Sequence, residues 1–215
     1  DFRRTLCVPT SPEEALDVVA NGNSRVIDVG RLAFVDEAGR RKTRYFHNLA
    51  SFGLGGEVDE RVNRSGKRLG GFLSFMVATL VSLVRYHGKR IRLRVDDHFD
   101  EEVVVLNVAV ANGQYHGGGM WVAPGADPCD GLFHVTIIGD LSLPQVFYYL
   151  PKLYNGKILQ VKQVRSLSGR KVEASSDERV LLDVDGEQPG RLPVTVEIIP
   201  SALRILGPGT GDRSA

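Results

Sequence analysis

The chain has 215 residues, of which 42% are hydrophobic and 25% charged, and this composition is typical of a globular protein rather than a disordered, collagen-like or coiled-coil chain. Its 27 basic and 26 acidic residues leave a formal net charge of +1, which gives no general attraction to nucleic acid, so we expect no nucleic-acid partner. Two cysteines are too few for a disulfide framework or a cysteine-type zinc site, and a reducing compartment, the cytoplasm, is expected.

Two further features concern membranes and processing. The longest apolar run, residues 72–84, is too short to span a bilayer, which takes about 20 residues, and we interpret it as a buried or amphipathic helix. The opening residues lack both the apolar segment of a signal peptide and an initiator methionine, and we interpret the chain as a fragment or a processed product.

The first predicted element is a helix over residues 12–21. Ser11 is a suitable N-cap, Pro12 suits the first helical position and Glu14 completes a capping box. The helix is predicted to stop at Gly22. The apolar side chains ahead of it have little local structure to pack against: Phe2, Leu6, Cys7 and Val8.

Residues 26–52 are predicted to form a β-hairpin around a turn at residues 36–39, because strand-forming residues flank a turn that contains Gly39. The glycine-rich residues 53–56 are predicted to be a flexible loop. Residues 57–87 are predicted to be helical with a break near residues 63–66, and Gly88 is a suitable stop.

From residue 91 onward the sequence predicts strand after strand. Segment 91–95 alternates apolar with basic residues, as in a strand with one buried face, and further strands are predicted at residues 101–112, 132–139, 161–167, 171–175, 179–185, 194–199 and 203–207. A short helix near residues 143–154, capped by Ser142, interrupts them. The close spacing of the turns predicts a mainly β (α+β) fold, an antiparallel β-sandwich or barrel with helical inserts.

Three segments contain residues suited to chemistry. The glycine-rich residues 112–119 follow a strand and could hold a phosphate through their N–H groups, but no helix or P-loop lysine follows, which favours a structural turn. Asp130, in the loop at residues 123–132, has backbone carbonyls close in sequence, a donor set that suits Mg²⁺, although the pattern alone favours a plain Asp-Gly turn.

The third segment is acidic. Asp183, Asp185 and Glu187 recur at the two-residue period of a strand and could share a face, where paired carboxylates serve as a general base and its partner. A hairpin turn with solvated acids is the structural alternative, and the pattern alone favours it.

The remaining ionisable residues give weaker indications. The five histidines show no metal spacing, and no serine lies in a Gly-x-Ser-x-Gly motif, so a hydrolase triad has no support. Two basic clusters are interpreted as solvated faces, with contact to anionic lipid headgroups as the alternative. They are Arg40, Arg41, Lys42 and Arg44, and Arg61, Arg64, Lys67 and Arg68.

Several segments, in this order, resemble the bacterial diacylglycerol kinase-like lipid kinases, relatives of sphingosine and ceramide kinases. Residues 1–6 resemble the end of the family's GTGNDFAR-L segment, residues 27–30 (IDVG) its IDLG strand, and residues 46–55 its FxNxxsxGxxa hairpin. The block NGQYHGGGMWVAPGADPCDGLFHV at residues 112–135 resembles NGxxxGGGxxxxPxAxxxDGxLxv and is the most specific match. Residues 185–187 match the family's DGE.

This resemblance implies an enzyme of two domains, a smaller α/β domain that binds ATP through a GGDGT loop and a larger β-sandwich domain. The chain contains neither GGDGT nor GTGN. The resemblance therefore implies that residues 1–25 are a remnant of the nucleotide-binding domain, residues 26–206 the sandwich domain and residues 207–215 a flexible tail. The apolar residues near the N-terminus would then belong to a severed interface, and the chain alone is expected to be inactive.

Residue roles are implied where the motifs match. Glu187 resembles the family's acceptor of the proton from the lipid hydroxyl, and Asp185 would tune that base or a nearby metal-bound water. Asp130 matches the ligand of a structural Mg²⁺, with the backbone carbonyls of Asp127 and Leu132 as its companions. ATP, with its own Mg²⁺, is expected to bind mostly through the nucleotide-binding domain, since phosphoryl transfer needs positioning, charge neutralisation and a base.

The implied function is that of an ATP-dependent lipid kinase, associated peripherally with a membrane, whose acceptor could be diacylglycerol, a sphingoid base, ceramide or an undecaprenol-like alcohol. Two alternatives stay open: NAD kinase, whose nicotinamide-nucleotide motifs are not found here, and a non-catalytic lipid-binding or regulatory module. Residues 69–87 are a candidate lipid-facing surface, or else a core helix. An edge of the sandwich could pair in a homodimer.

Overall fold

A computed structural model describes residues 1–65 and 86–208 of the chain. Strands make up 48% of the structure and helices 20%, which confirms the predicted mainly β class. The lipid-facing candidate at residues 69–87 and the tail at residues 207–215 lie largely outside the described residues. Of the break expected near residues 63–66, residues 63–65 are instead helical, and only residue 66 lies outside the described residues.

Two helices open the chain. Helix α1 (Phe2–Thr5) is a single turn, and α2 (Pro12–Asn21) begins where the cap signals predict. The side chain of Ser11 accepts a hydrogen bond from the backbone N–H of Glu14, as expected of an N-cap. The expectation that the apolar residues before α2 lack packing is wrong in part, because Leu6 is buried and the ring of Phe2 packs edge-on against His47.

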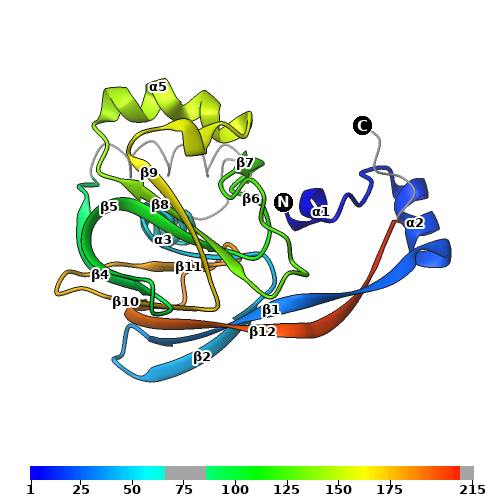
Figure 1. Cartoon of the computed structure of the whole chain (residues 1–215), viewed down its shortest axis with the longest axis horizontal. Helices are drawn as coiled ribbons and strands as arrows, with labels where there is room; N and C mark the ends of the chain where they lie inside the picture. The colour runs from blue at the N-terminus through cyan, green and yellow to red at the C-terminus, as the bar shows by residue number, and fades with distance from the viewer. Residues whose placement is uncertain (66–85, 209–215) are drawn as a thin grey trace.

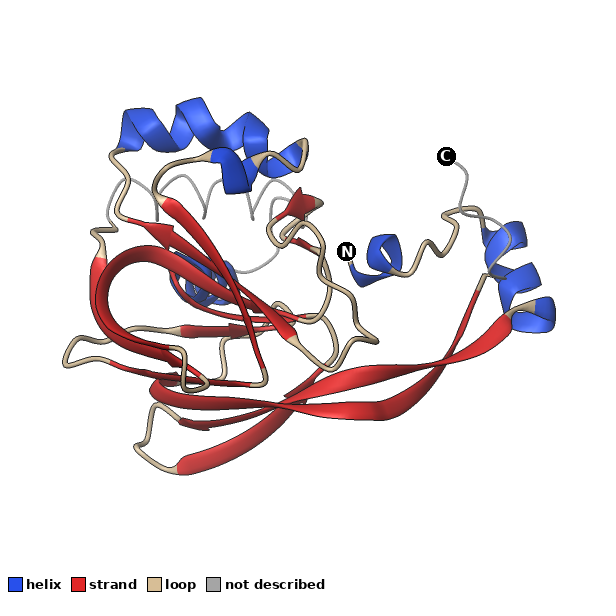
Figure 2. Ribbon diagram, in the orientation of Figure 1, coloured by secondary structure: helices blue, strands red, loops and turns tan. Residues whose placement is uncertain are grey.

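Ten of the described strands form one antiparallel sheet that bends into a sandwich, as predicted (Figure 2). In chain order they are β1 (Asn23–Val35), β2 (Arg41–Phe46), β3 (Leu49–Gly53), β4 (Lys89–Val95), β5 (Phe99–Ala111), β8 (Phe133–Gly139), β9 (Val164–Gly169), β10 (Lys171–Ser175), β11 (Leu182–Val184) and β12 (Arg191–Gly207). The order across the sheet is β11-β3-β5-β4-β10-β12-β1-β2, with β8 beside β5 and β9 beside β8. Two short strands, β6 (Tyr115–His116) and β7 (Met120–Trp121), form a separate hairpin.

Strand β5 makes the corner of the sandwich. Its first half pairs with β4 and its second half with β3 and β8, and the strand curls strongly between them (Figure 1). The main core lies between the layers, where the rings of Phe46 and Phe133 stack with centroids 5.7 Å apart. Gly30 lies directly against Phe46, since a Cβ at this glycine would come within 2.2 Å of the ring.

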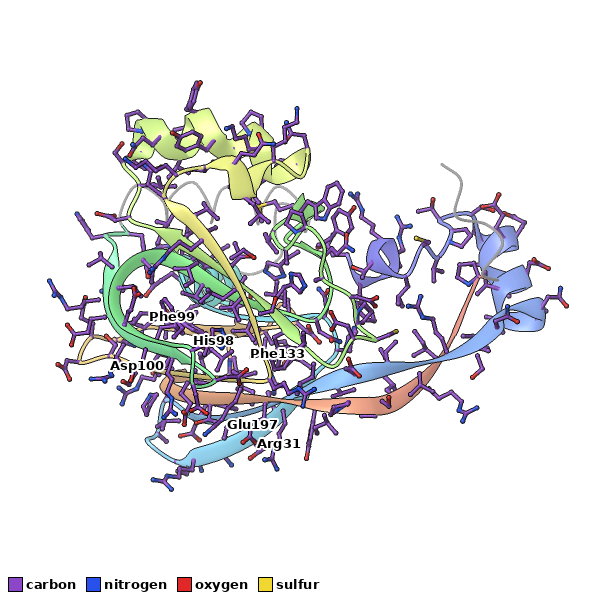
Figure 3. All side chains as sticks on the ribbon, in the orientation of Figure 1. Arg31, His98, Phe99, Asp100, Phe133 and Glu197 are labelled. Atoms are coloured by element: carbon purple, nitrogen blue, oxygen red, sulfur yellow. The ribbon has the colours of Figure 1, made fainter. Side chains whose placement is uncertain are left out.

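Strands β1 and β12 form a long ribbon that extends past the sandwich to α2 (Figure 1). Arg31 and Glu197 form an ion pair across it (Figure 3). The prediction of separate strands at residues 194–199 and 203–207 is wrong because the chain does not turn between them. Ser201 instead adopts a left-handed conformation with φ 52°, and its backbone N–H is bound by Asp28.

Two further predictions for residues 41–56 are wrong. The second half of the predicted hairpin breaks at His47 and Asn48 into β2 and β3, which lie in different parts of the sheet. Residues 54–56 are not a flexible loop but begin helix α3 (Leu54–Ser65). Glycine is required at two of these positions for close packing, because a Cβ on Gly55 would lie 2.6 Å from Ser51 Oγ and one on Gly56 2.5 Å from the backbone of Leu181.

Helix α5 (Leu143–Tyr154) and the 3₁₀ turn η1 (Ile158–Gln160) cover one side of the sandwich (Figure 1). Ser142 caps α5 as predicted, and the structure adds a capping box in which the backbone N–H of Ser142 donates to the side chain of Gln145. Its inward residues pack on a second part of the core that includes Leu106 and Ile138. No helix within the described residues is long and apolar enough to cross a bilayer.

Candidate functional site

The acidic segment forms a tight hairpin at the end of β11. Asp185 and Gly186 have φ values of 51° and 87°, as in a type I′ turn, and Val184 and Glu187 exchange backbone hydrogen bonds across it. The structure has the hairpin turn that the pattern alone favours, and Asp183, Asp185 and Glu187 do not share one face, because the chain reverses between them. Their carboxylates therefore have three different environments.

The carboxylate of Asp183 is completely buried beneath the turn. One oxygen accepts a hydrogen bond from the backbone N–H of Gly186 at 2.9 Å. The other lies 3.2 Å from Ser51 Oγ on β3 and 2.8 Å from Nε2 of His116 on β6. Asp183 thus links the hairpin to β3 and to the glycine-rich segment, a partnered arrangement that a buried carboxylate requires.

Asp185 fixes the turn between β2 and β3. Its carboxylate accepts hydrogen bonds from the backbone N–H groups of His47, Asn48 and Leu49, at 3.1, 3.2 and 2.9 Å, and lies 3.0 Å from Nδ1 of His47. Burial would raise the pKa of Asp185, but the hydrogen bonds from His47 and Leu49 outweigh it and hold the pKa below its usual range. The hydrogen bond between the His47 side chain and the Asp185 carboxylate also raises the pKa of the half-exposed His47, although partial burial of the imidazole acts in the opposite direction.

Glu187 is the most exposed acid of the three. Its side chain is 67% exposed, and an oxygen of its carboxylate lies 2.5 Å from the guanidinium of Arg44 on β2. The neighbouring backbone is fixed by the hairpin, so the carboxylate is held on a rigid support. Glu187 is therefore the most accessible of the three acids, since Asp183 is fully buried and the side chain of Asp185 is 21% exposed.

The glycine-rich segment lies next to this hairpin and forms the β6–β7 turn, which agrees with its structural interpretation. Gly117, Gly118 and Gly119 all have positive φ values, between 58° and 95°. The backbone N–H of Gly118 donates a hydrogen bond to the carboxylate of Asp1, 3.0 Å away. A glycine turn that binds one carboxylate in this way has the backbone geometry of a small anion site.

The predicted metal-binding residues lie in a different loop, between β7 and β8. Asp127 and Asp130 are exposed, and one oxygen of each accepts a hydrogen bond from the backbone N–H two residues ahead, that of Cys129 or Leu132. The described residues contain no group of three or more histidine, cysteine, aspartate or glutamate side chains able to hold a metal. The loop therefore fits only a cation that accepts one carboxylate, backbone carbonyls and water, a donor set that Mg²⁺ tolerates.

A chain of buried polar groups connects this loop to the acidic hairpin. The carboxylate of Asp28 accepts hydrogen bonds from the N–H groups of Gly131 and Ser201, at 2.8 and 2.7 Å. The side-chain amide of Asn112 donates to the backbone oxygens of both Asp28 and His47. The structure thus joins the two predicted sites through their supporting residues, whereas the acidic side chains themselves stay apart.

Four residues that shape this region were not predicted from the sequence: Asp28, Arg44, His47 and His116. Their partners lie far away in sequence, which is why spacing gave no signal for them. Three of them had a positional signal, because Asp28 lies in the IDVG segment, His47 in the matched segment at residues 46–55 and His116 in the glycine-rich segment.

The fold and this region define a two-layer β-sandwich domain with an acid-bearing Asp-Gly-Glu hairpin. A family model described as the YegS C-terminal NAD kinase beta sandwich-like domain matches residues 48–207. The chain belongs to this family, which confirms the resemblance found in its motifs.

Similar proteins carry kinase names. A diacylglycerol kinase of Mycobacterium tuberculosis (strain CDC 1551 / Oshkosh) is 29% identical over 213 residues, covering 98% of this chain and 67% of that protein. A "Probable lipid kinase YegS-like" of Chromohalobacter salexigens is 30% identical over 213 residues, covering 97% of this chain and 64% of that protein. These relatives place the chain in a lipid kinase family.

Solved structures share the fold. A crystal structure of a diacylglycerol kinase from Bacillus anthracis str. Sterne matches with a TM-score of 0.64 and 16% identity, over 96% of this chain and 62% of the other. Another structure from the same organism matches with a TM-score of 0.71 and 18% identity, over 96% of this chain and 64% of the other. The chain thus spans about 60–67% of the length of the relatives it matches.

Proposed function

We propose that the chain is the acceptor-side domain of an ATP-dependent kinase that phosphorylates the hydroxyl of a membrane lipid. The observation that carries this proposal is the division of roles in the Asp-Gly-Glu hairpin of a member of this family. Asp183 and Asp185 are engaged in holding backbone, and Glu187 is the acid exposed on a fixed turn. An accessible carboxylate on a rigid support suits a general base.

In the proposed reaction Glu187 accepts the proton of the lipid hydroxyl, and the hydroxyl oxygen forms a bond to the γ-phosphorus of ATP. The bond between that phosphorus and the bridging oxygen breaks, and ADP leaves with the electron pair. Arg44 orients the Glu187 carboxylate, and Asp185 holds the turn that carries both His47 and the start of β3. ATP supplies the phosphoryl group, and we propose that it binds mostly through residues outside this chain.

Mg²⁺ is proposed to bind the loop between β7 and β8. Asp130 would supply a carboxylate oxygen, and Asp127 and Leu132 would supply backbone carbonyl oxygens. A hard cation there would neutralise the exposed carboxylates and fix a loop that Asp28 already ties to β1 and β12. Its proposed role is structural.

The test is an assay of the complete protein that contains this chain. It would be purified and supplied with radiolabelled ATP and mixed micelles of diacylglycerol, sphingosine, ceramide or undecaprenol. Transfer of label to one of these lipids would support the proposal and identify the acceptor. A folded protein that binds these lipids but transfers no label would favour the non-catalytic lipid-binding module instead.

A second arm uses the chain alone under the same conditions. We expect no transfer, because the proposal assigns ATP binding to residues outside the chain. Transfer by the chain alone would contradict that part of the proposal and leave the assignment of the acceptor side intact.

A further inference from the structure

Helix α5 is apolar on nearly all sides although it lies on the outside of the sandwich. Of its twelve residues, LPQVFYYLPKLY, only Gln145 and Lys152 have a charged or amide side chain. Val146, Tyr149 and Leu153 pack against the core. A helix that needs only one apolar face for its own fold usually has a polar outer face, so the apolar outer face of α5 is unexplained by packing within the described residues.

Large apolar side chains are exposed along that outer face. Phe147 is 52% exposed, Tyr148 75% and Tyr154 54%, and Leu150 of α5 and Leu159 of η1 are also exposed. We call Phe147, Tyr148, Leu150, Tyr154 and Leu159 the α5 surface. Tyrosine and phenylalanine combine an apolar body with tolerance of a wet boundary, the property that enriches aromatic residues where proteins meet the lipid–water interface.

The charged residues in the segment that runs through α5 and η1 are all basic. The sequence contains no aspartate or glutamate between Asp140 and Glu173, whereas Lys152, Lys157 and Lys162 all fall within or just after α5 and η1. Lysines beside an exposed aromatic face attract anionic lipid headgroups near a charged membrane surface.

Another helix shows that exposed apolar residues alone do not give this combination. Helix α2 exposes Leu16 (68%) and Val19 (65%), but it carries three acids, Glu13, Glu14 and Asp17. Acids beside an apolar patch repel an anionic membrane, so α2 has no charge complementarity with it.

We propose that the α5 surface, with Lys152, Lys157 and Lys162, docks the protein on an anionic lipid surface. Charge complementarity favours this occupant over a protein partner, whose matching surface would have to be acidic and apolar together. The basic cluster of Arg40, Arg41, Lys42 and Arg44 is less suited to the role, because Arg40 pairs with Asp36 and Arg44 with Glu187.

The α5 surface is connected to the acidic hairpin through contacts within the fold. Just after α5, Gly156 lies against Trp121 of β7, where a Cβ would come within 2.6 Å of the indole. Trp121 stacks on Tyr115 of β6 and donates from Nε1 to Gln114. His116, which follows Tyr115, contacts Asp183 under the hairpin. Docking through α5 would therefore hold the acidic hairpin at a fixed place relative to the membrane.

The test measures binding and not catalysis, so it does not depend on the proposed phosphoryl transfer. The chain is sedimented with vesicles of phosphatidylcholine, with or without phosphatidylglycerol. One variant combines Phe147→Ser, Tyr148→Ser and Tyr154→Ser, and a second combines Lys152→Gln, Lys157→Gln and Lys162→Gln. The matched control combines Leu16→Ser and Val19→Ser on α2, and urea unfolding verifies that each variant is folded.

We expect the chain to bind the anionic vesicles at least about tenfold more tightly than the neutral ones, and each α5 variant to lose at least about tenfold of that affinity. The α2 control is expected to bind as the unchanged chain does. Absence of binding by the unchanged chain, equal binding to neutral vesicles, or full binding by a folded α5 variant would overturn the proposal.

A second copy of the chain is the competing occupant. Analytical ultracentrifugation of the same proteins distinguishes it from a membrane. The membrane proposal is wrong, and the α5 surface is a self-association surface, if the unchanged chain is a dimer that does not bind vesicles and the variant with Phe147→Ser, Tyr148→Ser and Tyr154→Ser is a monomer.

Discussion

The buried carboxylate of Asp183 lies 2.8 Å from Nε2 of His116, and this pair joins the acidic hairpin to the glycine-rich turn. The same carboxylate also accepts hydrogen bonds from Ser51 Oγ and the N–H of Gly186. One buried group therefore fixes three segments that are distant in sequence, and the exposed Glu187 stands on the turn that it holds.

Replacement of His116 should destabilise the protein strongly. His116→Ala leaves a buried carboxylate with one partner fewer, and we expect a loss of about 3 kcal/mol in the free energy of unfolding, measured in urea. His98→Ala is the control, because His98 is exposed and its loss should change stability by less than about 0.5 kcal/mol.

The double variant separates pairing from packing. If the His116→Ala penalty comes from the unpaired charge, adding Asp183→Asn should recover part of it, since a neutral amide costs less to leave with one partner fewer. Additive losses for the two substitutions would show that the pair has no coupling energy.

The ion pair of His47 and Asp185 predicts a dependence of stability on pH. The pKa of His47 is raised in the folded state, so its contribution is fully present below the unfolded value of about 6.5 and is lost as the pH rises through the folded value. His47→Gln should therefore lower the free energy of unfolding more at about pH 5.5 than at about pH 8.5. Because His47 is half exposed, the difference should stay below about 1 kcal/mol.

Asp185 predicts a second dependence of stability on pH, in the acidic range. Its pKa is lowered in the folded state, so its stabilising contribution is present above the unfolded value of about 3.9 and is lost as the pH falls through the folded value. Asp185→Asn should therefore flatten the fall of stability below about pH 4. His98→Gln is the control at every pH. If the His47→Gln and Asp185→Asn variants showed the same dependence of unfolding free energy on pH as the unchanged protein, the account would be contradicted.

Packing of β1 against Phe46 gives a prediction about the core. Gly30→Ala would place a methyl group within 2.2 Å of the Phe46 ring, and we expect a loss of about 1–3 kcal/mol in unfolding free energy from overpacking. Gly207→Ala is the matched substitution in the same ribbon, where the nearest atom, Arg25 Cδ, lies at an ordinary 3.4 Å. If both substitutions lowered the free energy of unfolding equally, contact with Phe46 would not be the cause of the loss.

Mg²⁺ should stabilise the chain through the loop between β7 and β8. We expect millimolar Mg²⁺ to raise the midpoint of thermal unfolding and Asp130→Asn to abolish the rise, since a ligand of the native state alone stabilises that state. Asp97→Asn, at an exposed site outside the loop, should keep it. A rise of the same size in Asp130→Asn would place the cation elsewhere.

The parts of the fold that follow from local signals could be predicted from the sequence. Helix α2 begins at Pro12 because Ser11 and Glu14 supply a cap within three residues of each other. The break between β2 and β3 could not be predicted in this way. It depends on Asp185, whose carboxylate binds the backbone of His47 from 138 residues away.

In the candidate site, too, the local motif could be predicted from the sequence and the contacts between distant segments could not. The motif match identified Asp185 and Glu187, yet their different environments come from the reversal of the chain at Gly186 and from partners on β2 and β3. Glycine composition was misleading at residues 53–56, since Gly55 and Gly56 are needed for close packing against Ser51 and Leu181 rather than for flexibility.

The most direct test of the account compares two carboxylates in the complete protein that contains this chain. Glu187 and Glu197 are both partly exposed, and each pairs with an arginine, Glu187 with Arg44 of β2 and Glu197 with Arg31 of β1. We expect Glu187→Gln to lower ATP-dependent lipid phosphorylation by at least about a hundredfold, as loss of a general base does, with the unfolding free energy changed by less than about 1 kcal/mol. Glu197→Gln should keep the activity, and a Glu187→Gln protein as active as the Glu197→Gln protein would contradict the assignment of Glu187 as the base.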